Sequence, residues 1–411
     1  MKMLFRLAGL VLLFLTGVLS TSCVSENERQ KGEEEANVIA EPDLTAEAAA
    51  WADSVTGSLT LQKRIGQLFM PAVYSVGDSQ NMALIADYVE RLGVGGLVLL
   101  KGKAASASEI ADTLDVIAPL GLFMAIDAEN GLSMRFEDAP KFPWNSEISP
   151  DVNEVVMFDY GREMARECSI AGINMILGPV MDVTPTGKEY LRGANRSFGG
   201  DAERVGRLGT AYSRGLESGG VMSVAKHFPG HGAAATDSHK GLAVVDRSRE
   251  ELLKTDLLPF RAYVNGGLSG VMVGHIYAPA LDGIERPASF SPVIMDSLLR
   301  RQMKFKGLIL TDALNMKGAR GFTAADALGS GADMVLAPLH TEDAMVEVRD
   351  AVERGELSEE TISDRCRRVL FYKYLRGIVG RKPAGRVPWN EKALHTGADT
   401  IRVLLRRGLK D

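Results

Sequence analysis

Short apolar segments recur along the chain between about residues 60 and 340, and this repetition limits the possible folds more than any other feature. Each segment is rich in valine, isoleucine, leucine or methionine. The segments are 66–73, 95–100, 122–129, 173–183, 221–228, 269–276, 307–314 and 332–339. Stretches with helical spacing of apolar residues separate most of them, as in 149–172 and 248–267. Continuous apolar strands that alternate with amphipathic helices are typical of a parallel sheet covered by helices.

The number of strand candidates favours a closed barrel over an open sheet. Eight strand–helix units fit the roughly 250 residues of a typical (β/α)8 barrel. An open, doubly wound sheet is the alternative, but no GxGxxG turn follows the first segment to support a dinucleotide site. We therefore predict an α/β fold with a single (β/α)8 TIM-type barrel. Its helix over 149–172 is expected to begin at Ser149-Pro150 and to end near Gly172.

Residues 1–22 have the composition of a secretory signal peptide. A lysine and an arginine supply its positive end, and 8–20 form an apolar segment too short for a stable membrane span. Small residues then lead to Cys23, whose position resembles the lipid-attachment site of a bacterial lipoprotein. An ordinary cleaved signal, with Cys23 incidental, is the alternative. We predict an exported lipoprotein, anchored in a membrane through its N-terminus, on the periplasmic side or at the cell surface.

The rest of the chain divides into three predicted segments. Residues 23–50 are polar and charged and are expected to form a lipidated, disordered tether. Residues 51–380 are expected to hold the barrel, which helical patterns in 341–377 would close. Residues 381–411 are too few for a second domain and form a C-terminal extension.

Charge and cysteine content argue against some classes of protein. The formal net charge is −6 and no run rich in lysine or arginine occurs, which argues against an electrostatic nucleic-acid binder. After Cys23 only Cys168 and Cys366 remain, far apart and without CxxC spacing. We expect two buried free thiols rather than a disulfide. We also expect a monomer without a cofactor.

Polar side chains lie towards the ends of the strand segments from the third to the seventh. In a barrel of this kind, active sites form at the carboxyl ends of the strands. Any one of these residues could be a capping residue or a hydrogen-bond partner in the core, but their agreement in position predicts a shared pocket. They are Asp127, Glu129, Asp182, Lys226, His227, His275 and Asp312, with Arg135 and Arg196 in the loops that follow.

The segment 226–241, KHFPGHGAAATDSHKG, holds three of the six histidines of the chain. His227 and His231 have the spacing of a zinc-binding helical pair, with Asp237 and His239 as further candidate ligands. Proline and glycine between the two histidines prevent the helical turn that would align them. A metal site built from a loop stays open as an alternative, but we predict no metal.

Proton transfer is the second interpretation of the same segment. Asp237 lies two residues before His239, so the carboxylate could pair with the imidazole, fix its tautomer and raise its basicity. An imidazole with an ordinary pKa near 6.5 can both donate and accept a proton near neutral pH. No GxSxG turn or activated cysteine accompanies it. The expected nucleophile is therefore a carboxylate, and Asp312, at the end of a buried strand, fits that role.

Taken together, these motifs resemble glycoside hydrolase family 3, and specifically its bacterial β-N-acetylglucosaminidase branch. The resemblance runs across nearly the whole barrel. The matching segments, in order, are IDAENGLSMRF, INMILGPVMDV, ANRSFGGD, VAKHFPGHGAAATDSH, GVMVGHIYAPALD, SFSPVIMDSLLRRQMKFKGLILTDALNM and ADMVLAP.

The resemblance implies a retaining double displacement. Asp312 would form a covalent glycosyl–enzyme, and His239, oriented by Asp237, would act as acid and then as base. Imidazole would thus replace one of the two carboxylates usual in a retaining enzyme. The residues implied in sugar binding are Asp127, Arg135, Arg196, Lys226 and His227. Asp182 and His275 are further candidate pocket residues, and His231 is expected to be structural.

Two positions depart from the branch. Ala233 and Ala234 stand where Asp-Thr is usual, and Asn130 stands where a glycine is usual. We predict removal of terminal β-linked N-acetylglucosamine from peptidoglycan or chitin-like fragments. A β-glucosidase is less favoured, because the glucosidase branch carries its acid/base glutamate on a second domain, for which this chain has no room. A glycan-binding lipoprotein without activity and a metal-dependent hydrolase also stay open.

Overall fold

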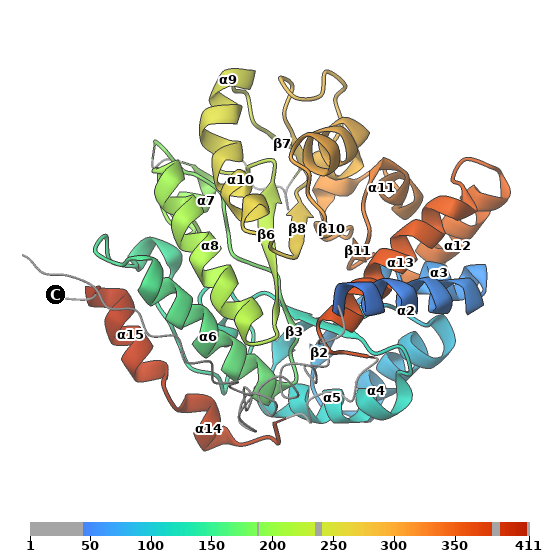
Figure 1. Cartoon of the computed structure of the whole chain (residues 1–411), viewed down its shortest axis with the longest axis horizontal. Helices are drawn as coiled ribbons and strands as arrows, with labels where there is room; N and C mark the ends of the chain where they lie inside the picture. Colours follow the sequence, from blue (N-terminus) through green and yellow to red (C-terminus); the bar gives the residue numbers. More distant parts are fainter. Residues whose placement is uncertain (1–43, 187–188, 235–240, 380–386, 409–411) are drawn as a thin grey trace, which may run out of the picture. The chain divides into compact units, whose positions relative to one another are not determined.

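The structure, a computed structural model, describes residues 44–186, 189–234, 241–379 and 387–408 (Figure 1). The predicted signal peptide and Cys23 lie outside these residues, so both stay predictions. Helix α2 (Leu44–Ser58) begins within the predicted tether, 23–50. Its sequence is rich in alanine, the strongest helix former, and Ala48 and Ala52 are buried. Helical structure therefore begins before residue 51.

Seven strands pair in parallel and form one curled sheet. Except for the short β7 and β9, neighbours in the sheet also follow one another along the chain. Most of the strand residues are buried, as expected for a parallel sheet covered on both faces. The strands are β2 (Ala72–Ser75), β3 (Gly96–Gly102), β4 (Phe123–Ile126), β5 (Met175–Ile176), β6 (Met222–Phe228), β8 (Gly270–Val273) and β10 (Leu308–Thr311).

A separate parallel pair, β1 (Phe69–Met70) and β11 (Val335–Leu336), contacts β3 through β1 and the outer strand β10 through β11. Only Pro71 separates β1 from β2, and the Thr311 N–H at the end of β10 donates to the Met334 carbonyl at 3.1 Å. All eight predicted segments thus contain strands. The predicted α/β fold is confirmed, whereas closure into a single (β/α)8 barrel stays a prediction.

Helices lie outside the sheet and connect its strands (Figure 1). Those that join consecutive strands are α4 (Ser79–Ala86) with η1 (Asp87–Leu92), α5 (Ala104–Ile117), α6 (Glu154–Ala171), α7 (Tyr190–Gly193) with α8 (Ala202–Ser218), α9 (Arg249–Glu251) with η4 (Leu252–Asp256) and α10 (Leu257–Asn265), η6 (Val293–Gln302), and α11 (Ala324–Ser330). Besides α2, the other α-helices of the described residues are α3 (Leu61–Gly66), α12 (Thr341–Glu353), α13 (Glu359–Leu375), α14 (Glu391–His395) and α15 (Ala398–Arg407). Short 3-10 helices are η2 (Leu132–Met134), η3 (Asn145–Glu147), η5 (Ala288–Phe290) and η7 (Lys317–Ala319).

Helix α6 begins later than the sequence predicts and ends where it predicts. The Asn153 side chain accepts from the N–H groups of Val155 and Val156 and caps the first turn. Residues 149–152 form a turn instead of the expected first helical turn, because the cap lies after Pro150. Gly172 has φ 75°, a left-handed conformation that ends the helix.

Close contact between α6 and α8 depends on two glycines. A Cβ atom on Gly161 would lie 2.1 Å from the Tyr212 carbonyl oxygen, and one on Gly215 would lie 2.1 Å from the Phe158 carbonyl oxygen. No side chain fits at such distances. The two helices therefore pack backbone to backbone beside the sheet.

Helices α14 and α15 lie within the predicted C-terminal extension, 381–411, and pack on α6 (Figure 1). The Ser149 N–H donates to the Leu405 carbonyl at 3.0 Å. Cys168 and Cys366 are buried free thiols, as predicted. Among the described residues, no helix combines the length and the apolar character that a membrane span requires.

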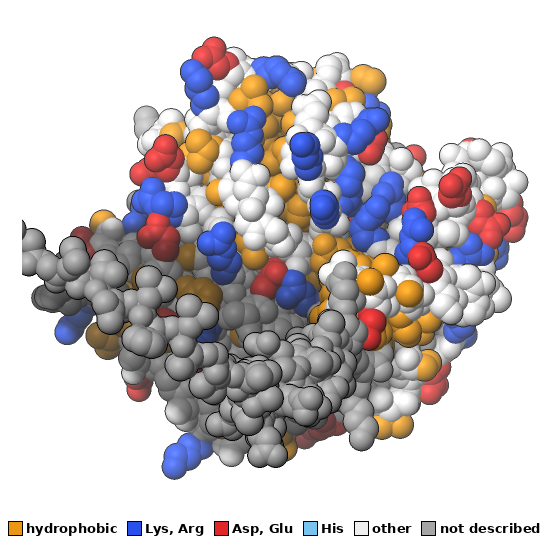
Figure 2. All heavy atoms as spheres, viewed as in Figure 1, with side chains coloured by type: hydrophobic (Ala, Val, Ile, Leu, Met, Phe, Trp, Pro, Cys, Tyr) orange, Lys and Arg blue, Asp and Glu red, His pale blue; other side chains and the backbone are white. Residues whose placement is uncertain are grey.

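Charged side chains are mixed over the visible surface. On the face in Figure 2, lysine and arginine side chains lie among aspartate, glutamate and apolar ones over the part of the chain that is described. Such mixing agrees with the modest net charge of −6. It gives no support to a nucleic-acid partner.

At the amino end of β4, Lys373 of α13 is fully buried. Its Nζ atom donates to Gln67 Oε1 at 2.7 Å and to the Gly121 carbonyl at 2.8 Å. Burial disfavours the charged form and lowers the pKa of Lys373 to about 7. The unfolded chain, with a lysine pKa near 10.4, therefore binds one more proton than the folded chain between about pH 7 and 10.

We predict that Lys373→Met removes a pH dependence of stability. Stability rises with pH wherever the unfolded state binds more protons, by about 1.4 kcal/mol per pH unit for one proton. The free energy of unfolding of the natural chain, minus that of Lys373→Met, should therefore rise between pH 7.5 and 9.5 in urea titrations. The control Lys254→Met, at an exposed side chain, should show no such rise. A flat difference for Lys373→Met would contradict the buried amine.

Candidate active site

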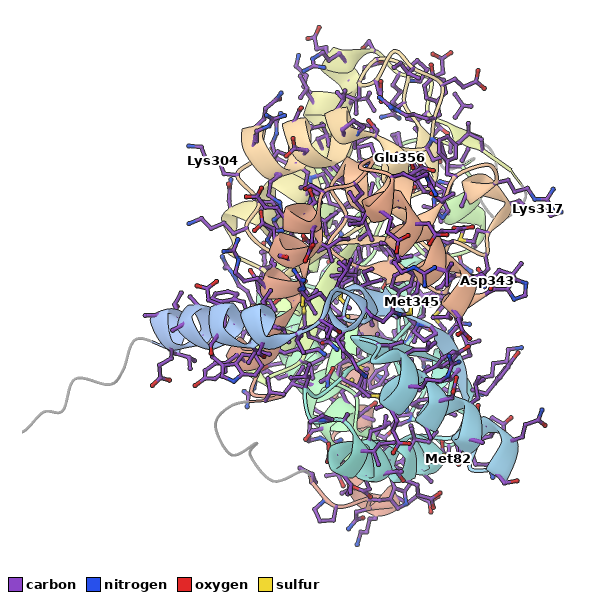
Figure 3. All side chains as sticks on the ribbon, turned by 90° about the vertical axis from the view of Figure 1, so that its right-hand side faces the viewer. Met82, Lys304, Lys317, Asp343, Met345 and Glu356 are labelled. Atoms are coloured by element: carbon purple, nitrogen blue, oxygen red, sulfur yellow. The ribbon has the colours of Figure 1, made fainter. Side chains whose placement is uncertain are left out.

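The carboxyl ends of the strands face one side of the molecule. In Figure 3, Lys304, which precedes β10, lies on the side opposite Lys317, which follows β10. Asp343, in the first turn of α12 after β11, lies on the same side as Lys317. The predicted site residues lie at the carboxyl ends of strands or in the loops that follow, so the fold brings them to this side.

A buried ammonium joins the ends of β4 and β6. Lys226 Nζ lies 2.7 Å from Asp127 Oδ1 and 2.8 Å from Glu129 Oε1. Arg135 donates to the other oxygen of Asp127. Burial lowers the pKa of Lys226, but the two carboxylates raise it further, so the net direction is upward and the ammonium stays charged. Burial likewise raises the pKa of Asp127, but Lys226 and Arg135 outweigh it and bring this pKa down to about 2.

Arg196 connects Glu129 to His227. Its Nε and Nη2 atoms donate to the two Glu129 oxygens, each at 2.8 Å, in a bidentate pair. Arg196 Nη2 also lies 3.3 Å from His227 Nε2. Burial raises the pKa of Glu129, but Arg196 and Lys226 hold it well below its usual range. The Glu129 carboxylate is therefore ionised and pairs with two cations.

Asp182, which follows β5, accepts hydrogen bonds from the end of β6 and from the loop after it. His227 Nδ1 lies 2.8 Å from Asp182 Oδ2, and the His231 N–H donates to Asp182 Oδ1 at 2.7 Å. Burial raises the pKa of Asp182, but His227 and His231 outweigh it and lower this pKa. Because a carboxylate only accepts, Nδ1 of His227 carries the hydrogen, and in the neutral ring Nε2 accepts from Arg196.

Asp312 follows β10 and lies beside this cluster. Its Oδ1 accepts the Ala313 N–H at 2.8 Å. Burial raises the pKa of Asp312, but His227, His275, the Ala313 N–H and Lys226 lower it in turn, and the net direction is downward. The carboxylate is therefore ionised, the form that a nucleophile requires.

His275, which follows β8, holds the peptide group after Asp312. Its Nε2 lies 3.0 Å from the Ala313 carbonyl and its Nδ1 lies 2.6 Å from Ser289 Oγ. A carbonyl only accepts, so Nε2 carries a hydrogen, and in the neutral ring Nδ1 accepts from the Ser289 hydroxyl. The predicted pocket residue is thus fully buried and contacts the backbone beside Asp312.

The glycine-rich loop after β6 requires close backbone contact. A Cβ atom on Gly232 would lie 1.9 Å from the Val183 carbonyl oxygen, one residue after Asp182. Glycine at this position therefore lets the loop lie against the end of the β5 segment. Buried His231 donates to Asp182 from its backbone, consistent with the structural role expected for it.

Asp237 and His239 lie outside the described residues. The described chain on both sides of them borders the candidate site. The Ala234 N–H donates to the His231 carbonyl at 3.1 Å. On the other side, β7 (Ala243–Val244) pairs with β9 (Ile276–Tyr277), directly after His275.

Three residues that support the site are not among the residues predicted for it. Asn145 Nδ2 donates to the Arg196 carbonyl at 2.7 Å, and Ser197 Oγ donates to the Asp182 carbonyl at 2.7 Å. Ser289 contacts His275. All three lie in loops or short turns without periodic spacing, and only their burial as polar residues distinguishes them.

The strand ends thus hold paired carboxylates, cations and imidazoles. A comparison of the sequence with models of protein families agrees with this arrangement. The family model described as "Glycosyl hydrolase family 3 N terminal domain" matches residues 60–371. The chain belongs to glycosyl hydrolase family 3. The family membership predicted from the motifs is confirmed.

Several relatives within the family carry related names. The chain is 28% identical over 376 residues to Beta-hexosaminidase A of Pseudoalteromonas piscicida, an alignment that covers 79% of this chain but 63% of that protein. It is 36% identical over 239 residues to a Beta-hexosaminidase of Neisseria meningitidis serogroup C, covering 56% of this chain and 65% of that protein. It therefore spans less than two thirds of the length of these relatives.

Solved structures of the family share the fold. A glycoside hydrolase family 3 beta-N-acetylglucosaminidase from Paenibacillus sp. has a TM-score of 0.69 at 29% identity, covering 84% of this chain and 68% of that one. A Beta-N-acetylhexosaminidase from Beutenbergia cavernae has a TM-score of 0.66 at 27% identity, covering 76% of this chain and 98% of that one.

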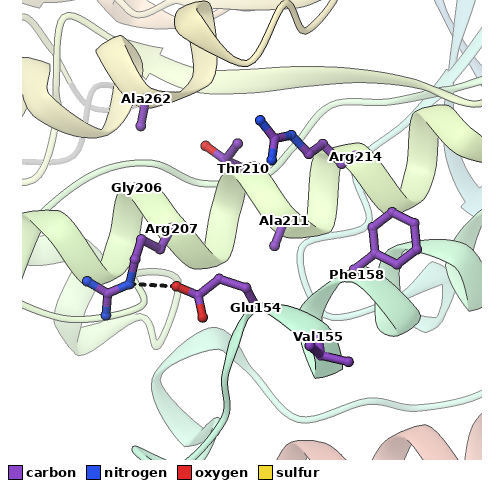
Figure 4. A pocket seen from close by; sticks show the side chains of 9 residues that line it. All are labelled: Glu154, Val155, Phe158, Gly206, Arg207, Thr210, Ala211, Arg214 and Ala262. Carbon is purple, nitrogen blue, oxygen red and sulfur yellow. Dashed lines mark ion pairs between the residues drawn. The ribbon is translucent and has the colours of Figure 1, made fainter. Parts of the chain in front are cut away.

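A metal site and a groove elsewhere in the fold are two further candidates, and both have less support. Within the described part of this family 3 chain, no three histidine, cysteine, aspartate or glutamate side chains are placed to hold a metal ion. A groove of about 490 Å³ lies between α6, α8 and α10, where Glu154 and Arg207 form an ion pair of 2.7 Å (Figure 4). None of the predicted site residues lines this groove.

We predict that Asp182→Asn moves the hydrogen of His227 from Nδ1 to Nε2. The asparagine oxygen should keep the backbone N–H bonds from His227 and His231, which leaves its NH2 group facing the ring. Nδ1 must then accept, and the ring loses the bond from Arg196 to Nε2. Nitrogen chemical shifts of His227 in NMR spectra report the tautomer. Asp282→Asn, at a buried carboxylate paired with Arg286, is the matched control and should leave these shifts unchanged. An Nδ1 hydrogen retained in Asp182→Asn would disprove the assignment.

Proposed function

We propose that the protein removes terminal β-linked N-acetylglucosamine from glycans, with retention of configuration. The observation that carries this proposal is the ionised Asp312 carboxylate, held by the Ala313 N–H beside the cationic cluster at the ends of β4 and β6. The names of the family relatives support the choice of an N-acetylhexosaminide as substrate.

In the proposed first step, Asp312 attacks the anomeric carbon while the bond to the leaving oxygen breaks. His239 donates its proton to that oxygen, and Asp237 stabilises the imidazole. In the second step His239 takes a proton from water, the water oxygen attacks the anomeric carbon, and the bond to Asp312 breaks. Two inversions give overall retention.

The proposed sugar-binding residues offer donors and acceptors in fixed positions. Asp127 is held by Lys226 and Arg135, so its oxygens cannot rotate freely and can accept sugar hydroxyls. Arg196 and His227 are fixed in the same way by Glu129 and Asp182. A site whose polar groups are already oriented loses less entropy when a sugar binds.

The remaining proposals concern the chain around the site. We propose that the β1–β11 pair closes the sheet into one (β/α)8 barrel, which the hydrogen bond between Thr311 and Met334 supports. We also propose peptidoglycan or chitin-like fragments as natural substrates and a membrane anchor at Cys23, on the periplasmic side or at the cell surface. The lipoprotein pattern of the sequence supports the anchor.

The decisive assay compares aryl β-N-acetylglucosaminide with aryl β-glucoside. We predict that Asp312→Ala lowers kcat on the N-acetylglucosaminide by about 10⁴-fold or more, because it removes the carboxylate that would form the covalent intermediate. Asp343→Ala, an exposed residue at the start of α12, is the control and should keep full activity. If the folded natural chain binds N-acetylglucosamine oligomers without hydrolysing them, it is a glycan-binding protein instead.

His239→Ala should slow turnover according to the leaving group. We expect a loss of about 10²- to 10⁴-fold on substrates with poor leaving groups, which need a proton, and a smaller loss on nitrophenyl substrates, which do not. Rates on a series of aryl glycosides measure this dependence. An equal loss on every member of the series would exclude His239 as the acid. Full activity after exhaustive chelation would exclude a metal-dependent hydrolase.

A further inference from the structure

A series of hydrogen bonds leads from the loop after β9 to the Asp312 carboxylate. The Ala313 N–H donates to Asp312 Oδ1 at 2.8 Å, and the carbonyl oxygen of the same alanine lies 3.0 Å from His275 Nε2. The other ring nitrogen of His275, Nδ1, lies 2.6 Å from Ser289 Oγ. Neither His275 nor Ser289 has a part in the proposed mechanism, yet both connect to its nucleophile.

The backbone around Asp312 is held by the neighbouring strands. The Asp312 N–H donates to the last carbonyl of β8, and the Leu314 N–H donates to the last carbonyl of β11, each at 2.9 Å. The Ala313 carbonyl belongs to the same peptide group as the Leu314 N–H. His275 therefore completes the hydrogen bonding of this peptide group, and it does so with a side chain, which a substitution can remove.

Packing and a hydroxyl group fix the imidazole of His275. The ring is fully buried and stacks on Phe290, with the ring centroids 5.8 Å apart and an angle of 7° between the planes. Because Nε2 donates to a carbonyl, Nδ1 of the neutral ring accepts from the Ser289 hydroxyl. Ser289 is itself fully buried, and its loop is closed by Asp282, which accepts from Ser291 Oγ at 2.5 Å. The donor nitrogen of the ring is thus held against the backbone.

The same contacts argue against a chemical role for His275. A general acid or base needs a nitrogen within hydrogen-bond reach of the reacting group. Both nitrogens of His275 are occupied, by Ala313 and by Ser289, and the ring is fully buried. Asp312, in contrast, is partly exposed, so a substrate can reach its carboxylate. His275 therefore acts on the reaction through the position of Asp312.

We propose that His275 is a positioning residue for the nucleophile. Its Nε2–H holds the Ala313 peptide group, and the Ala313 N–H in turn holds one oxygen of Asp312. Ser289 supports this arrangement by donating to the ring. The inference rests on the proposed function, because it treats Asp312 as the group that attacks the sugar. A displacement of about 1 Å in a reacting group costs about 10²-fold in rate, so a small shift of this backbone segment has a large effect.

Three substitutions separate the hydrogen bonds of His275 from its bulk. His275→Leu removes the Nε2–H, and we expect kcat/KM on aryl β-N-acetylglucosaminide to fall about 10²-fold. His275→Gln supplies an amide donor and an amide acceptor in place of the two ring nitrogens, and it should keep most of the activity. Ser289→Ala should lose about tenfold, the effect of one hydrogen bond.

Two controls carry the same changes elsewhere in the fold. His395→Leu removes an exposed imidazole whose Nε2 lies 3.1 Å from the Asp138 carbonyl. Ser213→Ala removes a buried hydroxyl that donates to a carbonyl within α8. Both controls should keep the natural kcat/KM. A lower value in the test variants then reports the contact with the backbone beside Asp312.

Binding and NMR measurements distinguish positioning from a general loosening of the site. The Kd for N-acetylglucosamine, measured by calorimetry, should stay within about twofold of the natural value in every variant, because the groups proposed to bind the sugar are intact. The amide proton signal of Ala313 should shift in His275→Leu and stay near its natural position in His275→Gln. Only the leucine variant disturbs the hydrogen bond from Ala313 to Asp312.

The outcomes for this inference and for the proposed function differ. Unchanged turnover in His275→Leu and Ser289→Ala, with an active natural chain, would overturn the role of His275 alone. A parallel loss of sugar binding and turnover, or a glutamine variant as slow as the leucine variant, would overturn it as well. Ser289→Ala, which removes a single hydroxyl, carries the test if His275→Leu does not fold.

A natural chain that binds N-acetylglucosamine without cleaving it would refute the hydrolase. A shifted Ala313 signal in His275→Leu, but not in His275→Gln, would then still support the positioning of Asp312 by His275. An unmoved signal in both variants would overturn it.

Discussion

The rest of the candidate active site depends on the buried ammonium of Lys226 between two carboxylates. Its side chain is almost completely enclosed, and its nitrogen lies within 2.8 Å of both Asp127 and Glu129. A buried charge without partners of this kind is strongly destabilising. Because the carboxylates follow β4 and the lysine lies near the end of β6, this contact spans the intervening strand β5 and sets the distance between the two strand ends.

The neighbouring charged groups are paired in the same way. Arg196 forms an ion pair with Glu129, and Asp182 accepts a hydrogen bond from His227. His275 donates to the peptide carbonyl next to Asp312. Lys226, Arg135 and Arg196 share the two carboxylates that follow β4, so this part of the cluster has an excess of one positive charge. His227, His275 and the Ala313 N–H, together with Lys226 of this cluster, lower the pKa of Asp312 and favour its ionised form. Sugar binding and nucleophile activation would thus share one set of buried charges.

Much of this arrangement could be predicted because it follows from local patterns. Apolar runs located the strands, and polar residues directly after them marked the site side of the sheet. The contributions of Asn145, Ser197 and Ser289 could not be predicted, because a loop residue shows no periodicity and its hydrogen bonds depend on distant segments. Helix α6 begins later than predicted because the Asn153 side chain, and not Pro150, marks its first turn. Helix α2 begins within the predicted tether because its alanines favour helix formation and two of them pack into the core.

The alternation of strands and helices, the burial of the strands and the residue types at the strand ends can be read from the amino-acid sequence, because they depend on spacing along the chain. Which charges pair depends on the three-dimensional fold. Lys226 meets a carboxylate 99 residues away and His227 meets one 45 residues away. Such contacts follow from the order and register of strands in the sheet, and no local pattern encodes the distance between two atoms so far apart in the chain.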